Sequence, residues 1–406
     1  MSAIGGIADF EKRSIDFSQL YRMKLAMSMR GRVRSSAYLG GSVNIIHNDD
    51  GFCDSYEYED RQPAIFERFG SEFVVATDSD SLNSSSVFEA YRLDGLDFLG
   101  ALPDGFALCQ FDGEKNILIL ARDKKGSKPL FYKLHRGKIY FSSEIKGISE
   151  AIGERLVVER EMLSLHLTAP IGVYNACDIF RDICEVMPGE CVIFGELGIS
   201  RFKYGARARI DNLKAKKRGE QNKSEIFSPY PTNIDQSLDD VLADALISFD
   251  YPQFDADMPS LCTLFDLARR RGKSSISFED RLRRQSFSYA REREDRLGAF
   301  YGIRAKGRYC AAQPEYTVEA RQKLRAYLGE KFWSLAEHQK SVLEKILGER
   351  KLDCLKQRFD GIPQKEKDTD AEIRILGMLI QTVMWTESRR LVISGRSEQV
   401  FNHGFQ

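Results

Sequence analysis

The first 204 residues contain short apolar runs that are paired around turn residues, and this pattern constrains the fold more than any other feature. Three such pairs occupy residues 106–121, 129–142 and 190–204. The turns between the paired runs are residues 112–115, 136–137 and 196–198. Apolar runs of strand length around a glycine-containing turn are typical of β-hairpins. Two stretches with a helical period of 3.6, residues 16–29 and 160–167, interrupt this β-rich region.

The pattern changes after residue 204. Residues 205–235 are crowded with Lys and Arg and then turn to Ser, Pro, Asn and Gln, which indicates a basic linker. The remainder, residues 236–406, is predicted to be helical, because apolar residues recur there at helical spacing. The stretches that carry this spacing are residues 237–248, 259–271, 318–347 and 370–386. The sequence therefore predicts a β-rich domain over 1–204, a linker and a helical domain over 236–406.

The charge balance excludes several classes of partner. The chain has 60 Lys and Arg against 60 Asp and Glu, so its formal net charge is zero. Tight binding to nucleic acid or an anionic membrane usually needs a strong positive field, so neither partner is expected. No apolar run approaches the roughly 20 residues of a membrane helix. The start of the sequence lacks the basic flank of a signal peptide, and we expect a cytoplasmic protein.

Cysteine and histidine are placed in a way that argues against metal. The eight cysteines form no Cys-x-x-Cys pair, and the five histidines are scattered. Structural zinc sites need such pairs at short spacing, so we expect reduced, mostly buried thiols and no metal site.

One continuous string points to a family. Residues 120–132 read Leu-Ala-Arg-Asp-Lys-Lys-Gly-Ser-Lys-Pro-Leu-Phe-Tyr, and residues 141–146 read Phe-Ser-Ser-Glu-Ile-Lys. This resembles the glutaminase domain of glutamine-hydrolysing asparagine synthetases, with its Leu-Ala-Arg-Asp-x-x-Gly-x-Lys-Pro-Leu and Phe-x-Ser-Glu-x-Lys strings. Residues 187–191, Met-Pro-Gly-Glu-Cys, fit the Pro-Pro-Gly segment of the same family. The resemblance covers essentially all of residues 1–204.

The resemblance implies a fold and a nucleophile. Such class II glutamine amidotransferase domains are α/β/β/α sandwiches of the N-terminal-nucleophile (Ntn) hydrolase type. Their nucleophile is a cysteine that follows the initiator Met, and the free α-amino group acts as base. Residues 2–10 align without gaps to the family's Cys-Gly-Ile-Ala-Gly-Ile-x-Asp-Phe, which puts Ser2 at the nucleophile position. A serine hydroxyl needs stronger activation than a cysteine thiol.

The rest of the expected pocket also departs from the family. Residues 39–46 correspond to the strand that supplies a glutamine-binding Arg, and they contain none. The oxyanion loop Asn-Gly-Glu-Ile-Tyr-Asn corresponds to residues 78–83, so Asp78 and Ser79 take its first positions. A carboxylate there repels a developing oxyanion. Of the His-Arg-Gly-Pro-Asp signature only Arg30 and Gly31 survive, which leaves Arg30 as a vestigial substrate-binding residue.

The C-terminal half carries a weaker likeness to the synthetase domain of the same family. Residues 249–252, 258–272 and 294–305 follow its motifs in order. The Ser-Gly-Gly-Leu-Asp-Ser loop that cradles the pyrophosphate of ATP is absent, and residues 274–280 lack the glycines of the second motif. We therefore expect an α+β protein: an Ntn-type sandwich followed by a mostly helical remnant of an ATP-pyrophosphatase (adenine nucleotide α-hydrolase-like) domain. No cofactor is expected, although the family uses ATP and Mg²⁺.

These losses favour one functional hypothesis over two others. The first is a catalytically degenerate homologue, a pseudoenzyme of the asparagine-biosynthesis lineage. It acts as an accessory or regulatory factor, as a homo-oligomer or in complex with an active synthetase or ligase. The second is a glutamine-independent amide ligase, like relatives that make β-lactams or macrocyclic peptides. The third is an N-terminal-nucleophile hydrolase that uses Ser2.

Overall fold

The structure is a computed structural model, and its elements divide into two compact units. Residues 1–154, 182–228 and 264–310 group into the first unit, and residues 155–181, 229–263 and 311–406 into the second. The residues that the structure describes are 2–11, 15–31, 34–49, 61–79, 82–168, 179–205, 225–226, 238–254, 258–272, 275–277, 296, 304–306, 318–359, 366–389 and 392–393. Most of 205–235 lies outside them, so the domain limits at 204 and 235 stay predictions.

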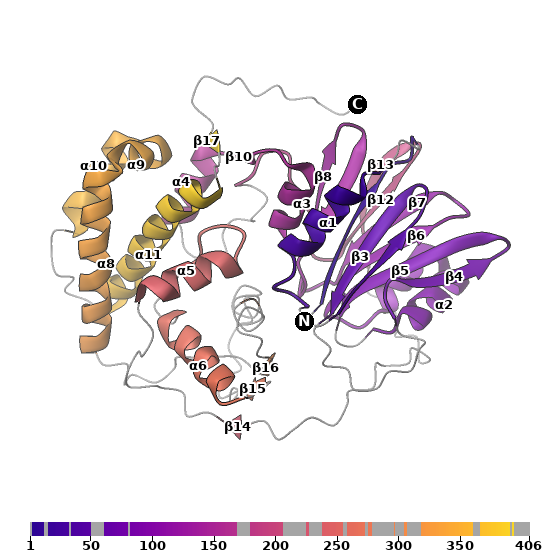
Figure 1. Cartoon of the computed structure of the whole chain (residues 1–406), viewed down its shortest axis with the longest axis horizontal. Coiled ribbons are helices and arrows are strands. Elements are labelled where there is room, and N and C mark those ends of the chain that lie inside the picture. Colours follow the sequence, from indigo (N-terminus) through magenta and orange to yellow (C-terminus); the bar gives the residue numbers. More distant parts are fainter. Residues whose placement is uncertain are drawn as a thin grey trace. The chain divides into compact units, whose positions relative to one another are not determined.

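Two antiparallel six-stranded sheets make up most of the first unit (Figure 1). The first sheet has the order β11 (Cys184–Glu185), β8 (Phe131–His135), β9 (Lys138–Ser142), β1 (Ala3–Ala8), β3 (Val43–Asp49) and β2 (Arg34–Leu39). The second has the order β13 (Gly198–Lys203), β12 (Glu190–Gly195), β7 (Ile117–Arg122), β6 (Phe106–Asp112), β5 (Ser71–Ser79) and β4 (Ala64–Arg68). The three hairpins expected from the sequence are β6–β7, β8–β9 and β12–β13, and each is confirmed.

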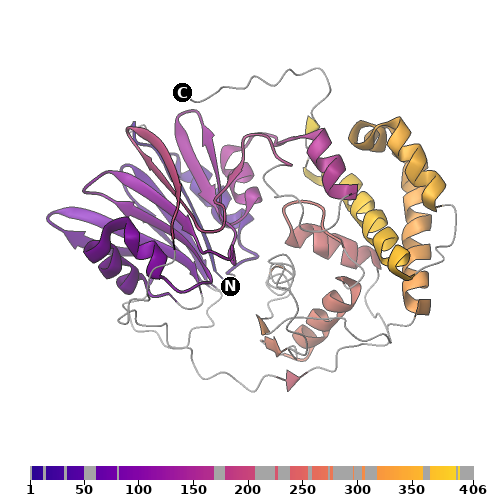
Figure 2. The same cartoon turned by 180° about the vertical axis from the view of Figure 1, so that it is seen from behind.

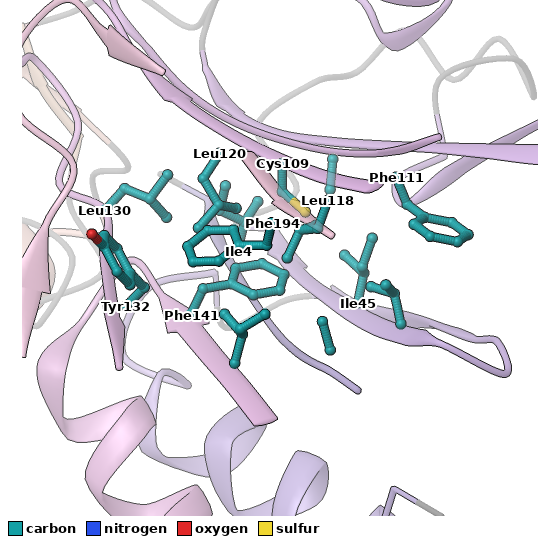
Figure 3. Packing of buried hydrophobic residues seen from close by; sticks show 14 of the residues in the cluster. Ile4, Ile45, Cys109, Phe111, Leu118, Leu120, Leu130, Tyr132, Phe141 and Phe194 are labelled. Atoms are coloured by element: carbon teal, nitrogen blue, oxygen red, sulfur yellow. The ribbon is translucent and has the colours of Figure 1, made fainter. Parts of the chain in front are cut away.

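The sheets stack on an apolar core (Figure 3). The first sheet contributes Ile4 and Phe141, while the second contributes Leu118 and Phe194. Strands alternate their side chains between two faces, so one face of each sheet fills this core and the other needs a further cover. Burying a side chain of this size stabilises the fold by about 1.5–3 kcal/mol.

Helices cover both outer faces. Against the first sheet lie α1 (Phe17–Ala26) and α3 (Ile145–Ile152), which pack on each other (Figure 1). The second sheet is covered by α2 (Ser84–Asp94) and the 3₁₀ helix η2 (Gly95–Ala101), seen from behind in Figure 2. The order of layers is therefore α/β/β/α, and the predicted sandwich is confirmed.

Side-chain caps explain where the two longer helices begin. The Asp16 carboxylate accepts a hydrogen bond from the Ser18 backbone N–H and starts α1. The Asn83 side chain accepts from the N–H groups of Ser85 and Ser86 and starts α2. Residues of these types satisfy the free N–H groups of a first helical turn.

The second unit is mainly helical, as expected. Its helices are α4 (Arg160–Thr168), α5 (Leu238–Ser248), α8 (Val318–His338), α9 (Lys340–Leu347), α10 (Glu349–Phe359) and α11 (Glu366–Arg389). Helix α6 (Met258–Arg270) spans the division between the units. Along α11, nearly every residue from Glu372 to Trp385 is buried, and α4, α5 and α8 pack against it. A helix that is buried all round is the centre of its domain.

The helical stretch expected over residues 318–347 is divided in the structure. Helix α8 ends at His338 and α9 begins at Lys340, and Gln339 between them has φ −124° and ψ 30°. A two-stranded parallel pair, β10 (Val157–Val158) with β17 (Val392–Ile393), completes the unit.

A separate small sheet has the order β14 (Glu225–Ile226), β15 (Ser275–Ser277) and β16 (Arg304–Lys306), all parallel. The sequence did not predict these strands. Across the described residues, no helix is both long and apolar enough to cross a bilayer.

Candidate functional site

Ser2 lies immediately before β1, in the middle of the first sheet. Strand β1 pairs with β3 on one side and β9 on the other, which fixes its position. The residue exposes only 9% of its surface. Its Oγ donates a hydrogen bond to the Asp78 Oδ1 at 3.1 Å. The position that the sequence assigns to a nucleophile is therefore buried and already hydrogen-bonded to a carboxylate.

Asp78 reaches this position from the opposite sheet. It is the second-last residue of β5 and pairs with Ala107 of β6, so its backbone is held in the strand. The side chain is fully buried. Because a buried carboxylate must be paired to remain charged, its partners decide the electrostatics of the site.

Arg30 is the first of these partners. Its Nη2 donates to the Asp78 Oδ2 at 2.8 Å, and its Nε donates to the Ser2 carbonyl oxygen at 3.4 Å. The next residue, Gly31, has φ +78°, and a Cβ there would lie 2.4 Å from the backbone of Asn48. Only glycine accepts both conditions. The surviving Arg-Gly pair is thus explained, since Gly31 lets the chain turn so that Arg30 enters the site.

Lys128 is the second cationic partner, and the sequence analysis did not single it out. Its Nζ lies 3.7 Å from the Asp78 Oδ1, and the side chain is 3% exposed. The residue follows the Arg-Asp-x-x-Gly turn of the family string. Lys128 lies within the quoted string, but nothing in the residues beside it indicates that its side chain is buried.

The remainder of the string holds the turn that presents Lys128. The Asp123 carboxylate accepts from the backbone N–H groups of Lys125 and Ser127 and from the Ser127 hydroxyl. Arg122 forms a buried ion pair with Glu185 and donates to the Gly126 carbonyl. These residues build the loop and do not touch Ser2, so they have a structural role.

Ser79 and Asn83 make local contacts that help to shape the chain after β5. The Ser79 Oγ accepts from the Leu82 N–H at 3.2 Å and closes a turn, while the Asn83 side chain caps α2. Asp80 and Ser81 lie outside the described residues. The structure thus brings together three of the four residues that the sequence singled out, namely Ser2, Asp78 and Arg30.

Two buried thiols of the sandwich, Cys109 and Cys191, are poor replacements for the missing cysteine. Burial raises the pKa of Cys191 to about 12, with a further contribution from the charge of Glu190. Burial also raises the pKa of Cys109 well above its ordinary value. Since the thiolate is the reactive form, neither group is a nucleophile at neutral pH. Among the described residues, no three His, Cys, Asp or Glu side chains gather in a way that could hold a metal ion.

Comparison with known proteins supports the lineage. A glutamine amidotransferase domain family matches residues 56–205. The glutamine-hydrolysing asparagine synthetase 3 of Bacillus subtilis is 29% identical over 167 residues, which are 41% of this chain and 26% of that protein. The amidase chyE of Penicillium rubens is 35% identical over 127 residues, 31% of this chain and 18% of its own length. The matches therefore span about a quarter or less of these relatives.

A solved structure gives a fainter likeness. The glutamine phosphoribosylpyrophosphate amidotransferase of Bacillus subtilis, complexed with ADP and GMP, aligns with 75% of this chain and 65% of its own. Its identity is 12% and its TM-score is 0.33, so the fold assignment rests on the stacked sheets themselves. The stacked sheets and the family match place a glutamine amidotransferase domain in this part of the chain, and the asparagine synthetase relatives support a class II, asparagine-synthetase-like lineage for it.

Proposed function

We propose that the amidotransferase domain is catalytically degenerate, and that the protein is an accessory or regulatory factor in amide-bond-forming biosynthesis. The main support for this proposal is the hydrogen bond from Ser2 to the Asp78 carboxylate, which is paired with the buried side chains of Arg30 and Lys128. Glutamine hydrolysis proceeds through a tetrahedral oxyanion, which needs hydrogen-bond donors aimed at it. Here the nearby donors, Arg30 and Lys128, are directed at Asp78.

Two further features support the same proposal. Ser2 offers a hydroxyl where the family has a thiol, and no Arg is present in the segment 39–46 to hold a glutamine carboxylate. We expect each loss to lower activity by itself, because Ser2 precedes β1 and the segment 39–46 lies in a separate part of the chain.

The direct test is ammonia release from glutamine. The full chain is assayed with and without ATP beside Ser2→Ala, and we expect the two proteins to show the same background rate. Glutamine turnover that Ser2→Ala abolishes would overturn the proposal. That result would favour the second candidate, a Ser2-dependent N-terminal-nucleophile hydrolase, for which the 3.1 Å contact between Ser2 and a carboxylate is the supporting observation.

We also propose that the chain does not use ATP or Mg²⁺. The residues present do not fit a triphosphate, because Ser275 and Ser277 stand where the family's second motif has its glycines. Glu279 and Asp280, which lie outside the described residues, are the remnants of that motif. Glycine-rich turns bind phosphate with their backbone N–H groups, and the sequence has neither this turn nor the Ser-Gly-Gly-Leu-Asp-Ser loop. Isothermal titration with Mg-ATP in about 0.15 M salt should show no saturable binding, since attraction by exposed Lys and Arg is screened beyond about 8 Å. Stoichiometric micromolar binding would favour a glutamine-independent ligase.

The accessory role implies a partner. We propose a cytoplasmic complex with an active synthetase or ligase, or a homo-oligomer. Light scattering on the purified chain tests the second arrangement, and an intact amide ligase encoded beside this chain would support the first.

A further inference from the structure

Asp78 and Asp123 are both buried carboxylates of the sandwich, but they are satisfied in different ways. Among the described residues, all of its partners are side chains: the Ser2 hydroxyl and the Lys128 ammonium at Oδ1, and the Arg30 guanidinium at Oδ2. They come from three distant segments of the chain. Asp123, in contrast, is held mainly by backbone N–H groups of its own turn.

The three donors are the kind that proteins use to bind a free carboxylate. The guanidinium and the hydroxyl donate hydrogen bonds to the two carboxylate oxygens, and the ammonium adds an ion pair at 3.7 Å. Arg30 and Lys128 each expose only 3% of their side chains, so bulk water has little access to these two cations. Buried cations are stable only beside a negative charge, and a carboxylate can supply that charge either as a ligand or as a side chain.

We propose that Ser2, Arg30 and Lys128 form a receptor for a small carboxylate, and that Asp78 occupies this receptor as an internal ligand. This deepens the proposed function and rests on it, because it names the contact that closes the degenerate site. A ligand on the same chain acts at a high effective concentration. Free carboxylates therefore do not displace Asp78 from the native protein.

The proposal predicts that removing the internal ligand opens the receptor. Asp78→Ala keeps β5 intact and removes the volume of one carboxylate, which formate fills. Thermal unfolding of the full chain is followed with sodium formate and with sodium chloride at equal ionic strength. For the variant, the midpoint should rise with formate and follow a saturable curve. At ten times the dissociation constant, the folding equilibrium constant should increase about 11-fold. The native chain should respond equally to the two salts.

Two further variants separate a receptor from a general salt effect. Asp112 is also buried, but its carboxylate accepts from the Tyr91 hydroxyl and pairs with the mostly exposed Lys115. Asp112→Ala should therefore show no saturable formate effect. Adding Arg30→Met to Asp78→Ala should abolish the effect of formate. Equal responses to formate and chloride in Asp78→Ala would overturn the proposal.

If Asp78→Ala does not fold in chloride, refolding from urea in formate gives the answer. Recovery in formate alone supports the receptor, and no recovery in either salt overturns it. Neither assay contains glutamine. If formate has no specific effect, the receptor proposal is wrong, and the result of the ammonia assay still stands. If glutamine is turned over, the proposed function is wrong, and the formate result still stands.

Discussion

Ser2 and Asp78 approach from different sheets of the sandwich, and the hydrogen bond of 3.1 Å between their side chains joins one end of β1 to one end of β5. The contact places a negative charge beside the residue at the nucleophile position. Arg30 and Lys128 both oppose that charge, so Ser2 and Asp78 belong to a buried network of polar and ionic side chains.

Restoring the family's nucleophile should not restore activity. Ser2→Cys places a thiol against Asp78, and a neighbouring carboxylate disfavours the thiolate that would attack glutamine. The missing Arg in residues 39–46 is unaffected by this change. We expect ammonia release no faster than with Ser2→Ala, after intact mass has established whether Met1 is removed. Glutamine-dependent turnover by Ser2→Cys would show that the pocket is still competent.

Arg30 should matter for stability because it balances a buried charge. Arg30→Met leaves the Asp78 carboxylate without its closest cation, and breaking a buried ion pair in this way costs about 3–5 kcal/mol. Arg92→Met is a matched control, since Arg92 and Glu89 are also 2.8 Å apart but both are well exposed. That pair should contribute about 0–1 kcal/mol. Hydrogen exchange of sandwich peptides measures both values, and equal losses would contradict this account.

The strands and layers of the sandwich could be predicted from the sequence more fully than the side-chain contacts within it. Paired apolar runs located the three hairpins, because strand periodicity and turn residues are local properties. Motif alignment located Ser2, Arg30 and Asp78. Lys128 was missed although it lies within the quoted string, since burial of a lysine depends on a carboxylate 50 residues earlier. The break at Gln339 was missed for a similar reason: nothing in the apolar spacing interrupts there.

Two buried glutamines should respond in opposite ways to the same substitution. Gln110 is fully buried, and neither its Oε1 nor its Nε2 has a hydrogen-bond partner among the described residues. Its strand neighbours Val75 and Ile119 belong to the apolar cluster under α2. Gln110→Met keeps the shape and removes an unsatisfied amide, so the free energy of unfolding should rise by about 1–2 kcal/mol.

Gln62 provides the comparison. Its Oε1 accepts from the backbone N–H of Thr77 at 2.6 Å and from the Thr77 hydroxyl at 3.2 Å. Gln62→Met leaves the buried Thr77 N–H without an acceptor and should lower the free energy of unfolding by about 1–3 kcal/mol. Calorimetry of both variants decides the point. A loss of stability in Gln110→Met would mean that this amide has a partner, such as an internal water.

The helical unit should lose stability in mild acid because of His166. Its Nε2 donates to the Pro252 carbonyl oxygen at 3.1 Å, and its ring meets Tyr251 edge to face. Burial lowers the pKa of His166 to about 4, the Pro252 hydrogen bond opposes this, and the charge of Arg374 adds to it. The folded unit thus keeps the imidazole neutral, whereas the unfolded chain protonates it near pH 6.5.

The sign follows from which state binds the proton. Between pH 6.5 and 4 the unfolded chain binds more protons, so stability falls as the pH falls through this window. The full difference of about 2.5 pKa units corresponds to about 3 kcal/mol, which is lost by pH 4. His166→Gln keeps a donor for Pro252 but does not titrate, so its stability should depend less on pH by this amount.

Tryptophan fluorescence is a selective probe for this experiment, because both tryptophans of the chain, Trp333 and Trp385, lie in the helical unit. Urea unfolding of the native chain and His166→Gln is compared at several pH values from 7 to 4. The carboxylates that titrate in this range are common to both proteins, so their contribution cancels in the difference. Parallel pH profiles would show that His166 titrates equally in the folded and unfolded states, and the assigned burial of its ring would then be wrong.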